Sequence, residues 1–305
     1  MKRRDLIKSA AILSAFTSTG FIPSRQVNTK SRDPESAPYK IKLSLNAYSF
    51  HSLLQEGSMD LFDLIDFCSA HGFDAVDLTG YYFPGYPDVP PDKYLYELKR
   101  KAFLQGLAIS GTGIRNEFAD PDEQKRRDDI QLIKRWVVAA SKMGAPVLRI
   151  FTGHLDIQNY TREQVLEWMV NDIRECVEFG KKHGVIIAVQ NHNAFIKTAA
   201  QTLELIKLIN HEWFGWILDT GSYRQGDPYL EITDVMPYAV SWQLKELIYI
   251  NGDPVEIDLD KIFTIIKKAG YQGYIPIETL GPGDPYVKVP EFLRKVKMAF
   301  GAHNI

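Results

Sequence analysis

The sequence predicts an α/β fold, namely a single-domain (β/α)8 TIM barrel over residues 41–305. A unit made of a helical stretch, a glycine and an apolar strand-like run recurs along the chain. Eight strand-like runs alternate with helical stretches, as in a parallel sheet with crossover helices. The stretch from residue 41 to the end is also close to the roughly 250 residues of such barrels. Because no GxGxxG motif follows the first run, a closed barrel is favoured over an open dinucleotide-binding sheet.

The recurring glycine marks the predicted end of each helix. In HGVIIAVQN, for example, Gly184 separates a helical stretch from an apolar run. Glycine adopts the positive φ of the position after a helix at little energetic cost. The same prediction applies to five glycines along the chain: Gly72, Gly106, Gly144, Gly184 and Gly270.

The predicted strands are short apolar runs flanked by turn residues. They lie near residues 41–47, 74–79, 107–112, 146–151, 185–190, 214–219, 240–245 and 274–279. Helical patterns fill the intervals, as in LFDLIDFCSA and LDKIFTIIKKA. Cys68 and Cys176 fall on two well-separated helices, so we expect buried, unpaired thiols and no disulfide.

Residues 1–40 are predicted to be a signal peptide and a linker. Arg3 and Arg4 precede a short apolar stretch over residues 7–16, which is the layout of a secretory signal. The paired arginines resemble a twin-arginine signal, which predicts export of the folded protein to the periplasm. An amphipathic N-terminal helix is the alternative. Residues 23–40 are rich in Pro, Ser and charge without periodicity, so they are interpreted as a linker.

Composition and charge limit the partners of the protein. The chain has 36 Lys and Arg against 38 Asp and Glu, a formal net charge of -2 and a pI of about 6.4. A nucleic-acid binder usually has a basic face, so no nucleic-acid partner is expected. No apolar run approaches the roughly 20 residues that span a bilayer, so no stable membrane insertion is expected. The expected partner is a small molecule, and the oligomeric state stays open, a homo-oligomer included.

Polar residues recur where the predicted strands end. In VIIAVQNH, WILDTG, VSWQLKE and IPIETL a polar residue follows an apolar run at the same late point. The C-terminal strand ends of a (β/α)8 barrel form its active site, and a buried polar group without a partner is costly. The alternative is a polar network that only fills the top of the barrel. The candidate site residues at these ends are Asn46, Tyr48, Asp77, Arg115, Arg149, His154, Gln190, Asn191, His192, Asp219, Arg224, Gln243, Lys245 and Glu278.

These residues also carry a family resemblance. Residues 41–300 resemble the xylose-isomerase-like barrels, a superfamily of sugar isomerases and epimerases that also contains endonuclease IV. The resemblance implies one divalent metal held by Glu, Asp, His and Glu on the fifth to eighth strands. The matching positions are Gln190 in VQNH, Asp219 in ILDTGS, Gln243 in WQLKE and Glu278 in PIETL, so glutamine replaces two of the four ligands.

The two replacements change what the implied metal site offers. Gln190, Asp219, Gln243 and Glu278 would supply two carboxylates and two amide oxygens. Oxygen ligands suit Mn²⁺, Mg²⁺ or Ca²⁺ better than Zn²⁺, and the lower charge predicts weaker metal binding or none. If the four side chains converge without a metal, we expect water or the Lys245 ammonium in its place.

The implied mechanism changes as well. Epimerases of the superfamily use glutamates on the fifth and eighth strands for proton transfer, but Gln190 cannot accept a proton near neutral pH. Glu278 is then the expected base, for an aldose–ketose isomerisation or for elimination or hydration of a keto sugar. His192 or Lys245 is the expected partner acid. His192 is also a candidate nitrogen ligand, and Lys245 can stabilise an enolate oxygen as a fixed charge. The remaining candidates are expected to bind the sugar: Asn46, Tyr48, Asp77, Arg149, His154, Asn191 and Arg224.

Three other functions stay open. A barrel that binds carbohydrate without catalysis is favoured by Gln190 and Gln243. A glycosidase needs two carboxylates at the active end, which Asp219 and Glu278 can supply. A nuclease similar to endonuclease IV needs many metal ligands and a basic surface. Only three of the seven histidines, His51, His154 and His192, are expected on loops at the active end, and the chain is not basic.

An aromatic segment, YYFPGYPDVPP, follows the second predicted strand. Its rings can form a platform or lid for a sugar, or they can pack a long loop or an oligomer interface. Both interpretations are kept for the four residues concerned: Tyr81, Tyr82, Phe83 and Tyr86.

Overall fold

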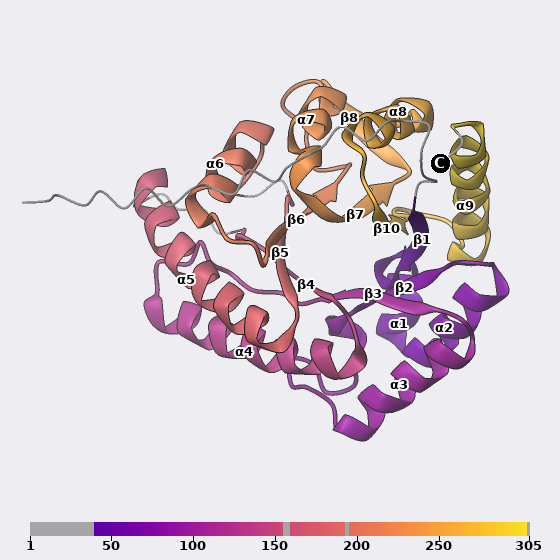
Figure 1. The fold of residues 1–305 in the computed structure, drawn as a ribbon, viewed down its shortest axis with the longest axis horizontal. Coiled ribbons are helices and arrows are strands. Elements are labelled where there is room, and N and C mark those ends of the chain that lie inside the picture. The colour runs from indigo at the N-terminus through magenta and orange to yellow at the C-terminus, as the bar shows by residue number, and fades with distance from the viewer. Residues whose placement is uncertain (1–39, 155–158, 193–194, 304–305) are drawn as a thin grey trace, which may run out of the picture. The chain divides into compact units, whose positions relative to one another are not determined.

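Eight parallel strands close into a barrel, and helices surround it (Figure 1). The computed structural model describes residues 40–154, 159–192 and 195–303. Within these residues the predicted (β/α)8 barrel is confirmed. The predicted signal peptide, and the linker up to residue 39, lie outside the described residues.

Strand and helix alternate along the chain as expected. The barrel strands are β1 (Ile41–Asn46), β2 (Ala75–Thr79), β3 (Ala108–Gly113), β4 (Val147–Ile150), β5 (Ile186–Gln190), β6 (Phe214–Asp219), β7 (Ala239–Lys245) and β10 (Gly273–Glu278). The helices are α1 (His51–Glu56), α2 (Leu61–Ala70), α3 (Asp92–Leu104), α4 (Glu123–Met143), α5 (Arg162–His183), α6 (Ala199–Ile209), α7 (Pro228–Val235), α8 (Leu259–Ala269) and α9 (Pro285–Ala302). Short 3-10 helices are η1 (Ala47–Phe50), η2 (Gly80–Tyr82) and η3 (Met236–Tyr238).

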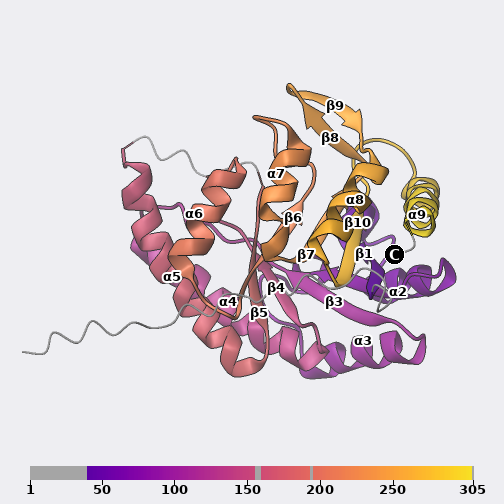
Figure 2. The ribbon, with the colours of Figure 1, turned by 45° about the horizontal axis from the view of Figure 1, so that its top comes forward.

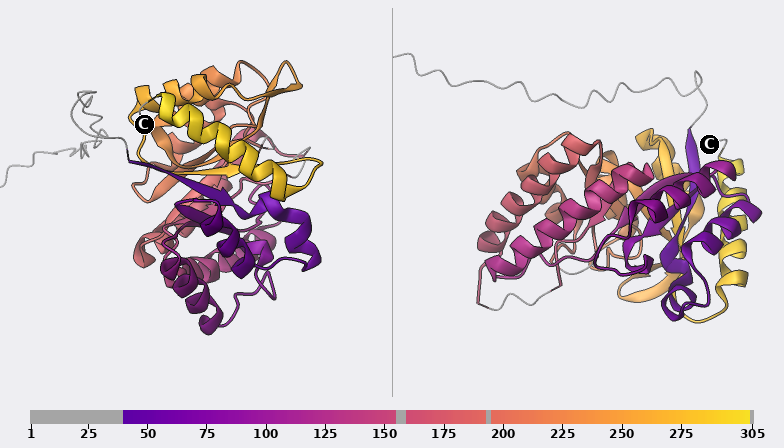
Figure 3. Two further views of the ribbon diagram at one scale, coloured as in Figure 1. Left: turned by 90° about the vertical axis from the view of Figure 1, so that its right-hand side faces the viewer. Right: turned by 90° about the horizontal axis from the view of Figure 1, so that it is seen from below.

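Pairing between the first and last barrel strands closes the ring. β1 runs parallel to β10 with Ile41 opposite Gly273, and the order around the barrel is β1-β10-β7-β6-β5-β4-β3-β2. Each predicted strand differs from the observed one by no more than one residue at either end. Parallel strands covered by helices are buried on both faces, which is why continuous apolar runs mark them in the sequence. Figure 3 shows α9 on the outside of the barrel beside α8, where it completes the ring of helices.

Both ends of the helices follow local sequence signals. The five predicted glycines have φ between 66° and 79°, so the predicted helix ends are confirmed. Most helices begin with a residue whose side chain accepts N–H bonds from the first turn, which stabilises the helix start. These N-cap residues are Asp60, Asp122, Thr161, Thr198, Asp227, Asp258 and Asp284.

A β-hairpin that the sequence analysis did not predict follows β7. It consists of β8 (Leu247–Ile250) and β9 (Asp253–Glu256), paired antiparallel outside the barrel (Figure 2). Its turn is Asn251-Gly252, with φ of 54° and 89°. Asn-Gly is a strong signal for a two-residue hairpin turn, and it is present in INGD. The strands on either side are short and exposed, so their hydrophobic pattern does not indicate a hairpin.

The hydrophobic core lies between the barrel and the helices. Trp136, Trp216 and Trp242 are among its largest fully buried side chains. Cys68 and Cys176 are buried and unpaired, as predicted, and burial raises the pKa of both thiols above its ordinary value. Several buried polar residues are the last residues of their strands, namely Gln190, Asp219, Lys245 and Glu278, so they lie at the C-terminal end of the barrel.

The two longest helices, α4 and α5, pack against each other through a charged contact. Arg126 Nε of α4 donates to Asp172 Oδ2 of α5 at 2.8 Å, and both side chains are buried. Their outer faces are polar, as in helices that cover a barrel. Across the described residues, no helix is both long enough and apolar enough to span a membrane.

We predict that Gly180→Ala destabilises the fold. Gly180 lies in α5 where a Cβ would be 2.5 Å from the Val185 carbonyl oxygen and 2.9 Å from Ile187 Cγ1, so α5 would be pushed off β5. Overpacking of this kind costs about 1–3 kcal/mol. Urea unfolding should show that loss. Gly301→Ala in α9 is the matched control, because a Cβ there meets nothing within 4 Å. Equal stability of the two variants would contradict the prediction.

Candidate active site

A cavity of about 1040 Å³ opens at the C-terminal end of the barrel strands. That volume is at the top of the usual range for small-molecule sites. Many sequence-predicted site residues line it: Asn46, Tyr48, Arg115, Arg149, His154, Gln190, His192, Arg224, Gln243, Lys245 and Glu278. Asp77, Asn191 and Asp219 are buried and are not part of the cavity lining.

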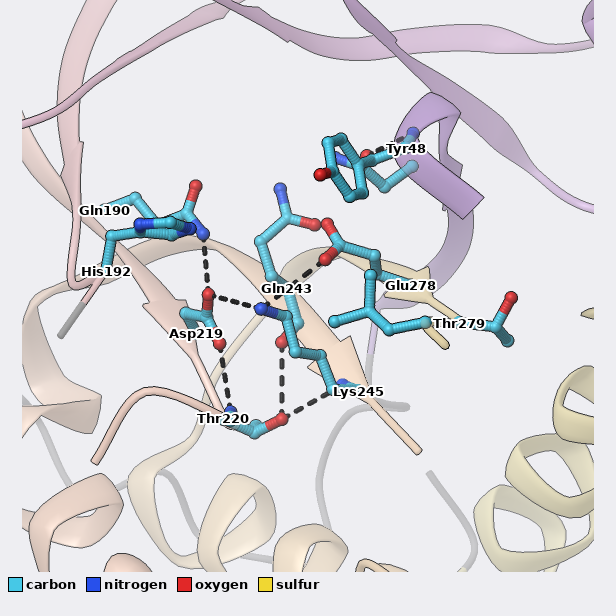
Figure 4. A network of polar contacts seen from close by, with 12 residues as sticks. Tyr48, Gln190, His192, Asp219, Thr220, Gln243, Lys245, Glu278 and Thr279 are labelled. Carbon is cyan, nitrogen blue, oxygen red and sulfur yellow. Dashed lines mark hydrogen bonds and ion pairs between the residues drawn. The ribbon is translucent and has the colours of Figure 1, made fainter. Parts of the chain in front are cut away.

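The centre of the site is an ammonium between two carboxylates (Figure 4). Lys245 Nζ donates to Asp219 Oδ2 at 2.8 Å and lies 3.5 Å from Glu278 Oε1. The strands impose this arrangement, because Lys245 of β7 pairs in register with Glu278 of β10. Gln243, two residues before Lys245, projects to the same side of β7. Of the four predicted ligand positions, Asp219 and Glu278 contact the Lys245 ammonium.

Asp219 is fully buried and held by several donors. Gln190 Nε2 donates to Asp219 Oδ2 at 2.6 Å, and the Gly221 N–H donates to Oδ1 at 2.9 Å. A carboxylate can only accept, so the amide nitrogen of Gln190, and not its oxygen, must face Asp219. Asn191 brackets the backbone of Asp219, donating to its carbonyl at 3.0 Å and accepting from its N–H at 2.9 Å. Asn191 is thus occupied within the protein.

Burial and neighbouring charges determine the protonation states of Lys245 and Glu278. Burial disfavours the charged ammonium, but Asp219 and Glu278 outweigh it and raise the pKa of Lys245. Burial also raises the pKa of Glu278, while Lys245 opposes the rise. Lys245 therefore stays charged, and Glu278 is a stronger base than an exposed carboxylate. Gln243 Oε1 is buried without a partner in the described residues, so it is free to accept from a ligand hydroxyl.

The family-type metal does not fit this set of residues. The ammonium of Lys245 already lies where the carboxylates of Asp219 and Glu278 meet, and Gln190 presents a donor to Asp219. A divalent cation at that point would face a positive charge on Lys245 and an N–H of Gln190. Over residues 40–154, 159–192 and 195–303, no group of three His, Cys, Asp or Glu is placed to hold a metal ion.

Two histidines stand at one side of the cavity. His154 Nε2 and His192 Nδ1 are 2.7 Å apart, so one ring donates to the other. Desolvation first, and then nearby positive charges that include Lys245, lower the pKa of His192 to about 4 against the opposing effect of Asp219. His192 is therefore neutral near pH 7. The backbone N–H of His154 donates to Glu117, a cavity residue that sequence analysis missed although it lies in the polar run after β3.

Aromatic groups line the side of the cavity next to η1. Tyr48 stacks on His51 with ring centroids 4.8 Å apart, and His51 Nδ1 is 2.7 Å from the Tyr82 hydroxyl. Asn46 accepts the Tyr48 N–H at 2.7 Å and so caps η1. Arg224 also lines the cavity, and its guanidinium lies 3.8 Å from the ring centroid of Tyr249 in the unpredicted hairpin.

The aromatic segment after β2 is divided between both predicted roles. Tyr81 lines the cavity. Phe83 and Tyr86 instead pack on Trp136, with ring centroids 5.3 and 5.8 Å away, and so anchor the loop. The segment is therefore partly cavity wall and partly loop packing.

Comparison with known proteins identifies the class. The family described as xylose isomerase-like TIM barrel matches residues 65–296, and the chain belongs to this family. An inosose isomerase from Halalkalibacterium halodurans is 19% identical over 253 residues, which cover 76% of this chain and 87% of that protein. The chain is thus distantly related to sugar isomerases and epimerases.

Solved structures agree with this fold. The crystal structure of 3-keto-D-glucoside 4-epimerase from E. coli has a TM-score of 0.69 at 14% identity, covering 85% of this chain and 100% of that one. The IOLI protein, which contains a zinc atom, has a TM-score of 0.67 at 18% identity, covering 86% and 98%. At these identities the similarity establishes the fold alone.

We predict that Asp77 makes stability fall as the pH rises. Burial raises the pKa of Asp77 to about 6; Arg149 opposes the rise and Glu278 adds to it. An unfolded Asp titrates near 3.9, so between about pH 4 and 6 the folded state binds more protons and loses stability with rising pH. Asp77→Asn should remove this loss, so from pH 4 to 7 it gains on the order of 2–3 kcal/mol relative to wild type.

The free energy of unfolding of wild type and Asp77→Asn, measured by urea unfolding at pH 4 and pH 7, gives the effect of the substitution. Asp253→Asn, at an exposed position of β9, is the control and should keep the wild-type pH dependence. Parallel pH profiles for wild type and Asp77→Asn would show that Asp77 titrates normally.

Proposed function

We propose that the protein moves a proton next to the carbonyl of a sugar, as an isomerase or as a lyase or hydratase of a keto sugar. The observation that supports this most is Glu278, a buried carboxylate with a raised pKa, beside the Lys245 ammonium in the cavity of about 1040 Å³. A base and a fixed positive charge side by side are what abstraction of a proton next to a carbonyl requires.

In the proposed reaction Glu278 takes a proton from the carbon next to the carbonyl. The C–H electron pair then forms an enolate, whose oxygen the Lys245 ammonium stabilises. Asp219 keeps Lys245 charged and in place. In an isomerisation the proton of the neighbouring hydroxyl passes to the former carbonyl oxygen, and Glu278 returns the abstracted proton to the former carbonyl carbon. In an elimination the enolate re-forms the carbonyl, a C=C bond forms, and the β-hydroxyl departs with its bond electrons and takes the proton from Glu278 to leave as water. His192, neutral near pH 7, is placed to exchange protons with the substrate oxygens.

Gln190 argues for a single base. A two-base epimerisation needs a second proton acceptor on the opposite side of the carbon, and an amide does not serve near neutral pH. The donation from Gln190 to Asp219 gives the amide a different task, which is to fix the carboxylate that holds Lys245. We therefore favour isomerisation or elimination over epimerisation.

We further propose that Lys245 takes the place of the family's divalent metal. Support comes from its position between Asp219 and Glu278 and from the two glutamines at ligand positions. We also propose, separately, that the protein is exported through the twin-arginine route. This proposal rests on Arg3 and Arg4 in the sequence.

The second candidate is a carbohydrate-binding barrel without catalysis. The contact between Lys245 and Glu278 favours it, because a paired carboxylate is a weaker base than an unpaired one. A glycosidase is disfavoured, since Asp219 is fully buried and its carboxylate is engaged by Gln190, Gly221 and Lys245.

Replacement of the base should abolish exchange. We expect Glu278→Gln to slow solvent-deuterium incorporation next to the carbonyl by about 10²–10⁴, because it removes the base with little change in shape. The assay uses the purified full chain with a panel of free and 3-keto sugars. Glu246→Gln is the matched control at the same end of the barrel, where Glu246 pairs with Lys288 at 2.7 Å. Undiminished exchange in Glu278→Gln would refute the assignment of the base.

Metal dependence gives an independent prediction. Because Lys245 supplies the positive charge, wild-type turnover should survive EDTA and should not increase with added Mn²⁺. Gln190→Glu combined with Lys245→Met adds a carboxylate and removes the ammonium, so this variant should bind Mn²⁺ in equilibrium dialysis while wild type does not. Turnover that is lost in EDTA and restored by Mn²⁺ would contradict the proposal. Sugar binding without turnover under every condition would favour the non-catalytic barrel.

A further inference from the structure

Arg149 is a buried cation that has no acidic partner among the residues the structure describes. Its side chain, on β4, is only 5% exposed and lines the cavity. In the described part of the chain Arg149 forms no ion pair, and it donates one hydrogen bond, from Nη2 to the Tyr81 hydroxyl. Nη1 is buried with no partner. A guanidinium has five N–H donors, and a buried charge without a counterion is expensive, so the molecule alone leaves Arg149 unsatisfied.

Other groups hold Arg149 firmly in this position. Its guanidinium lies 4.3 Å from the ring centroid of Phe151 and 5.5 Å from that of Tyr81. Gly113 on β3 leaves the space for the side chain, since a Cβ there would collide with the Arg149 guanidinium. The donor is therefore fixed in advance, as in sites built to bind a group of opposite charge.

A second arginine lies against the same tyrosine. The Arg115 guanidinium is 4.4 Å from the ring centroid of Tyr81, and Arg115 also lines the cavity. Like Arg149, it has no ion pair within the described residues. The Tyr81 ring thus brings two guanidinium groups to one side of the cavity.

The nearest acidic groups already have other partners or lie too far away. Glu278 contacts Lys245, and Glu117 accepts the His154 N–H. Asp77 acts on Arg149 only through space, since no ion pair joins the two side chains. A neutral hydroxyl would satisfy one N–H of Arg149 but would not balance its charge.

We propose that the substrate carries an anionic group, a carboxylate or a phosphate, which binds Arg149 and Arg115. This inference rests on the proposed function for the reacting end of the substrate, which lies at Glu278 and Lys245 in the same cavity. The substrate class is then a sugar acid or a sugar phosphate, and the anion fixes which carbon faces the base.

Binding of three matched sugars to the full chain tests this inference. Isothermal titration calorimetry with D-glucose, D-glucuronate and D-glucose 6-phosphate should give at least one anion about 10- to 100-fold tighter than glucose, as for charge-assisted hydrogen bonds. The tighter of the two anions tells carboxylate from phosphate. Binding needs no turnover, so the result is separable from failure of the proposed catalysis.

Variants test whether the tighter binding of the anionic sugar depends on Arg149 and Arg115. Arg149→Met should reduce the preference for the anion at least 10-fold, and Arg149→Lys should retain part of it. Arg135→Met, at an exposed position of α4 outside the cavity, should leave the preference unchanged. Circular dichroism checks that each variant is folded. The inference is overturned if neither anion binds more tightly than glucose, or if the preference survives in both Arg149→Met and Arg115→Met.

Discussion

The site depends on one interaction, the ammonium of Lys245 between the carboxylates of Asp219 and Glu278. Two buried carboxylates side by side repel each other, so an unpaired pair would hold a proton or take up a cation. Lys245 supplies that cation from within the chain, at 2.8 Å from one carboxylate and 3.5 Å from the other. This contact is consistent with Gln190 at the position where the family resemblance implies Glu, because less negative charge needs less compensation.

The barrel makes this contact possible through strand register. Lys245 lies opposite Glu278, and Gln243, two residues earlier on β7, lies opposite Asp219, so three neighbouring strands bring the four groups to the same end of the barrel. The sequence was sufficient to predict that these residues lie at the C-terminal end of the barrel, because each of them follows an apolar run at the end of a parallel strand. It was also sufficient for the strands themselves and for the helix ends at glycine, since both depend on local patterns and on burial.

Other features depend on contacts that local patterns do not encode. Asn191 was expected to bind the sugar; in the structure its side chain donates to the Asp219 carbonyl and accepts from the Asp219 N–H, a contact across 28 residues. The hairpin after β7 is short and exposed, so its alternation is weak despite the Asn-Gly turn. Arg149 was a candidate at a strand end, but the sequence did not indicate that Tyr81, Phe151 and Gly113 would surround it and that it would form no ion pair within the described part of the chain.

We propose that Lys245 occupies the position of the metal that the family resemblance implies. Crystals of the full chain grown with Mn²⁺, measured at a wavelength where manganese scatters anomalously, test it most directly. If Lys245 occupies this position, we expect no anomalous peak between Asp219 and Glu278, and we expect the Lys245 nitrogen in hydrogen-bond contact with Asp219. A manganese peak bound by Asp219, Glu278 and the two glutamine oxygens, with Lys245 turned away, would contradict it.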